Sequence, residues 1–154
     1  MAKIESSVTI ARPVEEVFRF FLDLDKNAPK TDPNVESVVK IPEGPTGAGT
    51  TFHFRQKVLG KIRATTTMFI SVEPNRQIAI AARLGPLRPK GAITFDRTSR
   101  GTTVAVRLDP NPVAALKLLS PVFARIGRKV WDGRLARVKA AMESSPPDGG
   151  VQTA

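Results

Sequence analysis

The chain contains no cysteine and no tyrosine, and its 154 residues include one tryptophan and one histidine. Without cysteine it has no disulfide, no thiolate metal ligand and no cysteine nucleophile. A lone histidine, His53, gives too few ligands for a zinc centre. Its neighbours Phe52 and Phe54 are expected to point inward, which turns His53 to solvent, away from any serine–acid pair. We therefore predict no catalytic residue, no metal site and no cofactor.

Long hydrophobic runs are also missing. No stretch approaches the roughly 18 consecutive apolar residues of a membrane-spanning helix. The chain opens with the polar and charged segment MAKIE, without the basic and then apolar pattern of a signal peptide. These absences predict a soluble, cytoplasmic protein. A chain of this length is about the usual size of one domain and can bury its own core.

Positive charge is in excess, with 24 Lys and Arg residues against 14 Asp and Glu residues, a formal net charge of +10. Such a surface favours anionic partners, which include RNA, an anionic membrane and an acidic small molecule. The alternative is that the excess only keeps the surface solvated. Aromatic residues make up 6% of the chain, which disfavours single-stranded nucleic acids because their binding relies on stacking. We expect at most weak contact with a membrane or RNA.

Alternation of apolar and polar residues predicts seven strands. After the first strand the chain has a helical segment, and the other six strands follow with short turns between them. Strands joined by short turns pair antiparallel, because parallel pairs need long crossover connections. The predicted strands are residues 3–11, 35–41, 50–58, 62–72, 77–84, 91–96 and 102–108.

Apolar residues at helical spacing predict a short amphipathic helix after Pro13, and residues 23–34 are expected to form a turn or short helix and a loop. Residues 112–143 are helical in period, with a break at Pro121, because an interior proline loses a hydrogen bond. Residues 144–154 are rich in Pro, Gly and Ser and are predicted to be a disordered tail. The predicted domain is residues 1–143.

These elements predict an α+β fold in which a curved antiparallel sheet is covered on its apolar face by the long C-terminal helix. Such an arrangement tends to leave an apolar cavity between the two layers. We expect Arg134, at the edge of the helix stripe, to reach the cavity mouth and pair with an acidic ligand head. The predicted lining, which leaves Phe69 outside, is Phe52, Phe54, Thr66, Met68, Ile70, Ile80, Ile93 and Phe95 from the sheet, and Phe123, Ile126 and Val130 from the helix.

Five segments follow one another along the chain: SVTIARPVEEVFRFFLDLD, GAGTTFHF, ISVEPNRQIAI, ITFDRTSRGTTVAVRLD and LARVKAAME. Over residues 3–143 their order and spacing resemble the START-like (SRPBCC) superfamily, in particular its polyketide cyclase/dehydrase and lipid-transport branch. The resemblance implies a helix-grip fold around a cavity for a small hydrophobic molecule. Well-studied cyclases of this superfamily carry Trp and Arg on the inner face of the fourth strand, where this chain is expected to place Ala64, Thr66, Met68 and Ile70, a face without a cation.

The first hypothesis for function is therefore a non-catalytic binding or carrier protein for a lipid, isoprenoid or polyketide-like molecule. A second is a cyclase or dehydratase that works mainly by holding a flexible chain in a reactive shape. A third is a basic regulatory protein associated with the ribosome or a membrane. The resemblance alone does not choose among them, because one fold serves many functions.

Overall fold

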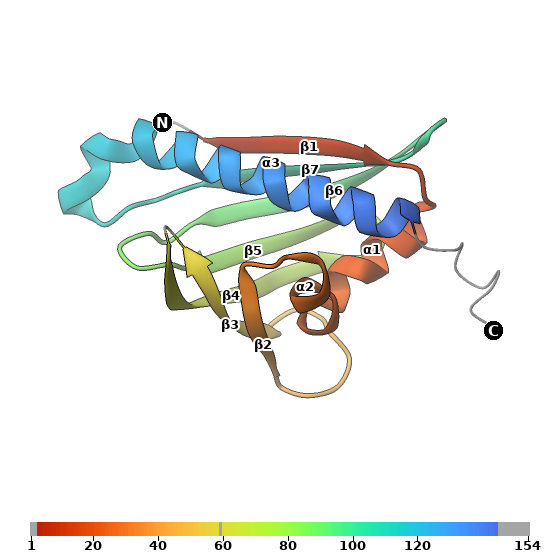
Figure 1. Cartoon of the computed structure of the whole chain (residues 1–154), viewed down its shortest axis with the longest axis horizontal. Coiled ribbons are helices and arrows are strands. Elements are labelled where there is room, and N and C mark those ends of the chain that lie inside the picture. Colours follow the sequence, from red (N-terminus) through yellow and green to blue (C-terminus); the bar gives the residue numbers. More distant parts are fainter. Residues whose placement is uncertain (1–2, 59, 145–154) are drawn as a thin grey trace.

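The computed structural model describes residues 3–58 and 60–144, and its seven strands form one antiparallel sheet. The strand order across the sheet is β1-β7-β6-β5-β4-β3-β2, so the first strand pairs with the last and β2 lies at the far edge. Figure 1 shows this sheet with its helices on one face. The strands are β1 (Ile4–Ile10), β2 (Val35–Ile41), β3 (Thr51–Val58), β4 (Lys61–Glu73), β5 (Gln77–Arg83), β6 (Lys90–Thr98) and β7 (Gly101–Asp109).

The helices interrupt and follow the strands as expected. They are α1 (Val14–Leu22), α2 (Leu24–Thr31), the 3-10 helix η1 (Ala114–Leu119) and α3 (Ser120–Ser144). The α+β helix-grip architecture predicted from the sequence is thus confirmed. None of the helices in the described part of the chain combines the length and the hydropathy that crossing a bilayer requires.

The core lies on the inner face of the sheet, the face that α1 and α3 cover. Alternate residues of β7, among them Val104, Val106 and Leu108, are buried there. Phe18 and Phe21 of α1 meet the ring of Phe95 edge-on, with centroids 5.1 and 5.4 Å away. This aromatic cluster fixes α1 over one end of the sheet.

The C-terminal helical region is divided at the predicted place. Pro121 is the second residue of α3, where its missing N–H costs no helical hydrogen bond, and η1 precedes it. Ser144, which the sequence assigned to the tail, is the last residue of α3. The remainder of the predicted disordered tail, residues 145–154, lies outside the described residues.

The predicted register of β4 is wrong. Phe69 is 2% exposed and lies on the inner face, whereas Met68 and Ile70 are 39% and 50% exposed. Thr66 also lies on the outer face, because it pairs with exposed His53 while the adjacent Thr65 pairs with buried Phe54. β4 is apolar on both faces, so alternation alone could not orient it.

Packing and a bulge explain the correct orientation of β4. The ring of Phe69 packs against Phe52 with centroids 4.9 Å apart, which places the larger side chain in the core. The register against β5 shifts between Phe69 and Ser71, so Ile70 is an extra residue in the strand. Such a bulge is not visible in a strict two-residue period.

Candidate functional site

Four of the predicted sheet residues, Phe52, Phe54, Ile80 and Ile93, are buried on the inner face. Phe95 is also buried there, but its ring packs against α1 rather than toward α3. With the corrected register, Thr65, Thr67 and Phe69 take the inner positions predicted for Thr66, Met68 and Ile70.

The register also alters the comparison with cyclases. Arg63 pairs with buried Gln56 near the start of β4, but its side chain is exposed and its Nε donates to Val58 O at 3.3 Å. The expected face of Ala64, Thr66, Met68 and Ile70 is the outer face. The sequence argument therefore compared the wrong face of β4 with the cyclases, and the inner positions are those of Thr65, Thr67 and Phe69.

α3 is held against β1. A Cβ on Gly127 would clash with Ile4 Cδ1, so glycine permits this close approach. Further along both elements, Ser6 and Asp132 are joined by a hydrogen bond between their side chains, Oγ to Oδ1. Among the strands of the described chain, only β1 packs against α3 over an extended length.

The other side of α3 carries an apolar stripe of Phe123, Ile126 and Val130, with Arg134 one turn beyond. Residues spaced three and four apart share a helix face, so these four side chains point the same way. At the end of the stripe, Arg134 reaches Gln56 of β3. Phe123 is partly buried, while Ile126 and Val130 are 40% and 42% exposed.

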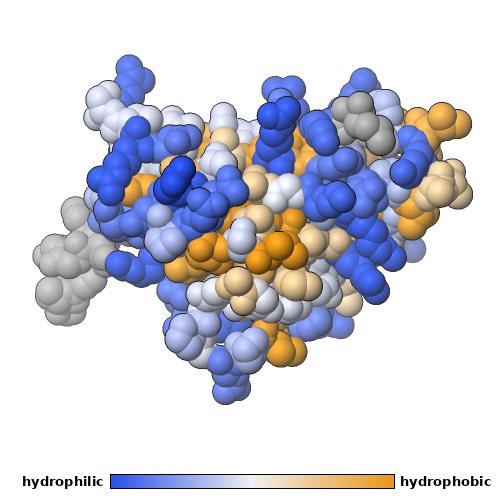
Figure 2. All heavy atoms as spheres, turned by 180° about the vertical axis from the view of Figure 1, so that it is seen from behind, coloured by the Kyte–Doolittle hydropathy of each residue, from blue (hydrophilic) through white to orange (hydrophobic). Residues whose placement is uncertain are grey.

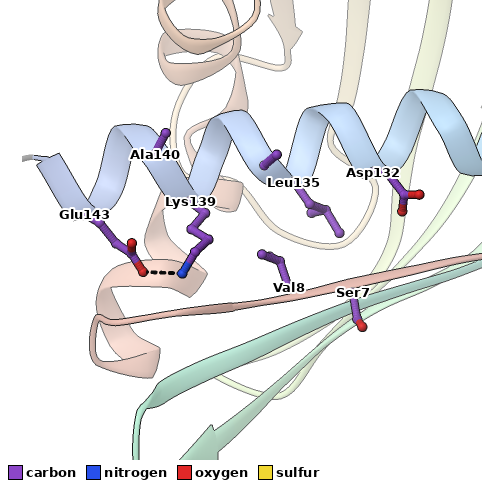
Figure 3. A pocket seen from close by; sticks show the side chains of 8 residues that line it. Ser7, Val8, Asp132, Leu135, Lys139, Ala140 and Glu143 are labelled. Atoms are coloured by element: carbon purple, nitrogen blue, oxygen red, sulfur yellow. Dashed lines mark hydrogen bonds and ion pairs between the residues drawn. The ribbon is translucent and has the colours of Figure 1, made fainter.

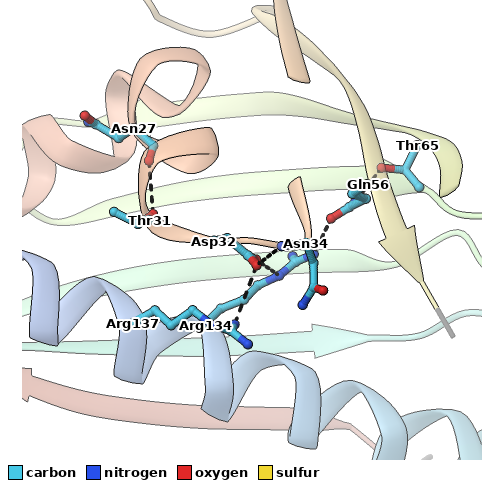
Figure 4. A network of polar contacts seen from close by, with 8 residues as sticks. All are labelled: Asn27, Thr31, Asp32, Asn34, Gln56, Thr65, Arg134 and Arg137. Carbon is cyan, nitrogen blue, oxygen red and sulfur yellow. Dashed lines mark hydrogen bonds and ion pairs between the residues drawn. The ribbon is translucent and has the colours of Figure 1, made fainter. Parts of the chain in front are cut away.

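Arg134 connects α3 to the sheet through a polar chain (Figure 4). Its Nη2 donates to Gln56 Oε1 at 2.6 Å, and Gln56 Nε2 donates to Thr65 Oγ1 at 2.7 Å. Gln56 and Thr65 are both buried. The guanidinium also lies 5.2 Å from the ring centroid of Trp131. This series of hydrogen bonds lies at the Arg134 end of the apolar stripe.

Asp32, at the end of α2, is the carboxylate of this network. Its Oδ2 lies 3.6 Å from Arg134 Nε and its Oδ1 lies 3.7 Å from Arg137 Nη1. Burial lowers the pKa of Arg134, Asp32 acts to raise it, and the charge of Arg137 lowers it further. Two arginines therefore share one buried carboxylate, and the cluster keeps an excess positive charge.

A groove of about 470 Å³ lies on the β1 side of α3 (Figure 3). Lys139 Nζ donates to Thr9 O at 2.7 Å, and Ala11 N donates to Glu143 Oε2 at 2.9 Å. These bonds satisfy backbone groups at the free edge of β1, where unpaired groups invite aggregation. Lys139 and Glu143 of this groove thus bind the sheet edge, and the groove is separate from the predicted ligand site.

The sequence singled out Arg134 and the helix stripe, and their role toward a ligand stays a prediction. It did not single out Asp32, Gln56, Thr65 and Arg137, which form the polar network around Arg134. Gln56 continues the alternation of Phe52 and Phe54, so extending that pattern by two residues finds it. No pattern of spacing connects Asp32 to a helix so far along the chain. His53 is exposed as predicted, with Nδ1 3.2 Å from Thr66 Oγ1 on the outer face.

A family model described as polyketide cyclase/dehydrase and lipid transport matches residues 1–143. The chain belongs to this family. The match spans the whole sheet and all but the last residue of α3, and the START-like relationship inferred from the five segments is thereby confirmed. No curated protein matches the chain in sequence.

Solved structures share the fold at low identity. The di-domain ARO/CYC StfQ from the steffimycin biosynthetic pathway is 20% identical with a TM-score of 0.72, covering 90% of this chain and 49% of StfQ. Ara h 8.0201 is 17% identical with a TM-score of 0.75, covering 93% of this chain and 98% of its own. TTHA0849 from Thermus thermophilus is 18% identical with a TM-score of 0.72, covering 94% and 99%. This chain spans about half of StfQ, and these likenesses show the fold alone.

Proposed function

We propose that this protein binds a small hydrophobic molecule between the apolar stripe of α3 and the inner face of the sheet. The observation that carries the proposal is the exposure of Ile126 and Val130 in the stripe of α3 that ends at Arg134, the residue that reaches β3. Covering an aliphatic surface that is exposed to water lowers the free energy of the system, so such a surface favours an apolar ligand. The family to which the chain belongs includes lipid transport, which supports this class of ligand.

The polar chain at the end of the stripe favours a ligand with a polar or anionic group at one end. Arg134 and Arg137 together carry one more positive charge than Asp32 neutralises. A ligand head placed beside Arg134 completes this charge balance while its apolar part lies along Val130 and Ile126. Lipids, isoprenoid acids and polyketide-like molecules all have this form.

The direct test is native mass spectrometry of the protein purified from its own host, followed by extraction of the bound molecule. We expect an adduct of a few hundred daltons that organic solvent removes. Repeated preparations that carry only solvent and buffer adducts would count against a carrier that retains its cargo.

A matched pair of variants locates the site. Val130→Asp places a charge on the stripe, and Val39→Asp places the same charge on the outer face, where Val39 is similarly exposed. We expect Val130→Asp to weaken the binding of anilinonaphthalene sulfonate at least tenfold and Val39→Asp to leave it unchanged. Equal loss in both variants, each shown to be folded by circular dichroism, would place the dye on the general surface.

The role of Arg134 is tested by comparing an anionic and a neutral probe. Arg134→Ala should weaken anilinonaphthalene sulfonate about fivefold more than neutral N-phenyl-1-naphthylamine, because only the anion loses a charge partner. The variant also leaves Gln56 Oε1 unpaired, so its melting temperature must be measured in parallel. Equal weakening of both probes removes Arg134 from ligand recognition.

A further inference from the structure

The junction of η1 and α3 carries a cluster of exposed aliphatic side chains, which we name the tip: Leu118, Leu119 and Val122. Leu118 is 95% exposed, Leu119 is 45% exposed and Val122 is 50% exposed. The tip projects at one end of the molecule in Figure 1, and apolar side chains gather at the corresponding end in Figure 2. One exposed leucine is ordinary, but a contiguous apolar projection indicates an interaction surface.

The surroundings of the tip are cationic. Residues 110–131 contain no Asp or Glu but four cations, namely Lys117, Arg125, Arg128 and Lys129. Arg128 lies 3.9 Å from Asp132, and within the described chain no ion pair involves the other three. The tip therefore combines apolar side chains with uncompensated positive charge.

Helix geometry places the two kinds of side chain together. Val122, Arg125 and Lys129 are spaced three and seven residues apart, so they share one face of α3. Lys117 adjoins Leu118 in η1. Segments that bind at a membrane surface have a similar arrangement, with cations beside aliphatic side chains. In such segments the apolar side chains enter the boundary between the lipid headgroups and the acyl chains.

We propose that the tip docks this protein on an anionic lipid bilayer. Leu118, Leu119 and Val122 enter the interface, and Lys117, Arg125 and Lys129 contact the lipid headgroups. A second copy of the chain fits the tip poorly, because each copy carries a net charge of +10. RNA fits it less well than lipid, since aliphatic side chains give bases no stacking platform. This proposal is independent of the proposed ligand site.

Co-sedimentation of the full chain with vesicles tests the proposal. In 100 mM salt we expect binding to phosphatidylcholine vesicles that contain 30% phosphatidylglycerol and at least tenfold weaker binding to pure phosphatidylcholine. Leu118→Ser should weaken binding about tenfold, whereas Val39→Ser on the outer face should not. Arg125→Glu should weaken it more than fivefold. Its control is Arg100→Glu, in the turn between β6 and β7, at the opposite end of β7 from η1.

The absence of native cysteine allows a second, site-specific measurement. Leu118→Cys creates the only thiol in the chain, and labelling it with the fluorophore NBD reports the polarity around residue 118. We expect a blue shift and a rise in emission with anionic vesicles, and no change for NBD on Val39→Cys. This readout separates insertion of the tip from adhesion of a basic protein by charge alone.

Three results would overturn the proposal. The first is equal loss of vesicle binding in Leu118→Ser and Val39→Ser, or a shift of the NBD signal at residue 39 in place of residue 118. The second is a concentration-dependent dimer in sedimentation velocity that Leu118→Ser abolishes, which would assign the tip to a second copy. The third is tighter retention on single-stranded RNA than on anionic vesicles at equal salt.

Discussion

The two halves of α3 are held very differently. In the C-terminal half Leu135 and Val138 are buried, and the side chains of Lys139 and Glu143 bind the backbone of β1 and of the residue that follows it. In the N-terminal half, buried residues are confined to Ser120 and Ala124, and Val122, Ile126 and Val130 stay open to solvent, as do Leu118 and Leu119 of the preceding η1. One helix thus serves both as a structural element and as an exposed apolar surface.

The difference teaches how a small domain can keep a binding surface without losing its fold. Apolar burial and hydrogen bonds at the C-terminal half stabilise the helix against the sheet. The N-terminal half is expected to contribute less to stability, which agrees with the proposal that its exposed side chains bind a ligand or a lipid surface. Regions that bind are often those with low local stability.

The largest expected contrast is between two leucine-sized side chains on the same helix. Leu135→Ala should cost about 3 kcal/mol in the free energy of unfolding, because Leu135 is 1% exposed and its removal leaves a cavity. Ile126→Ala should cost less than about 1 kcal/mol, since this side chain is already partly in water. Urea unfolding measures both. Similar losses would show that the two halves are equally packed.

The shared carboxylate provides the next contrast. Asp32→Ala leaves Arg134 and Arg137 without their acidic partner and should lower the free energy of unfolding by about 2 kcal/mol. This value is below that of a fully buried ion pair, because both arginines are partly exposed. As a control, Glu36→Gln removes the exposed ion pair with Arg55 and should cost at most about 0.5 kcal/mol. Equal thermal unfolding of the two variants would mean that the network at Asp32 adds nothing beyond a surface pair.

The two interior glycines of α3 should respond oppositely to alanine. Gly133→Ala should stabilise by about 0.5–1 kcal/mol, because its Cβ meets Arg137 at an ordinary 3.6 Å and alanine favours helix. Gly127→Ala should destabilise by about 1 kcal/mol, because the new Cβ displaces the buried side chain of Ile4. Ile4→Ala in the same chain should abolish this penalty. A stabilising Gly127→Ala would show that α3 is loosely held at this point.

Much of the fold could be predicted from the sequence because its signals are local. Two-residue alternation defined the strands, and the apolar period of α3 with Pro121 near its start defined the helix boundary. The orientation of β4 failed because Met68, Phe69 and Ile70 are all apolar, and packing against Phe52 decided which one is buried. A bulge compounds such errors, since it changes the period itself.

The site was less predictable because it depends on contacts between distant segments. The stripe of Phe123, Ile126 and Val130 follows from helical spacing, so the sequence predicts it, and its role as ligand lining stays a prediction. The carboxylate that holds Arg134 comes from Asp32 in a separate helix–strand connection, and nothing in the local sequence connects the two. Net charge predicts an anionic partner, which stays a prediction, and gives no location for it; the proposed location rests on the exposure of the tip.

The smallest expected effect concerns pH and tests how the C-terminal half of α3 is tied to β1. The hydrogen bond from Lys139, together with that from the Ala11 amide, lowers the pKa of Glu143 below its ordinary value of 4.5. A carboxyl with a lowered pKa in the folded state contributes stability above its unfolded pKa and loses it as the pH falls through the folded value.

Glu143→Gln should therefore be slightly less stable than wild type at pH 7, and the difference should shrink as the pH falls below 4.5 and through the lowered pKa of the folded state. Because the carboxyl lies at the surface, salt should also reduce the difference. Urea unfolding of both proteins at pH 7, 5, 4 and 3 measures it. A gap that stays constant across this range would show that the side chain acts through shape or neutral hydrogen bonding. The charge of Glu143 would then play no part in holding the C-terminal half of the helix to the sheet.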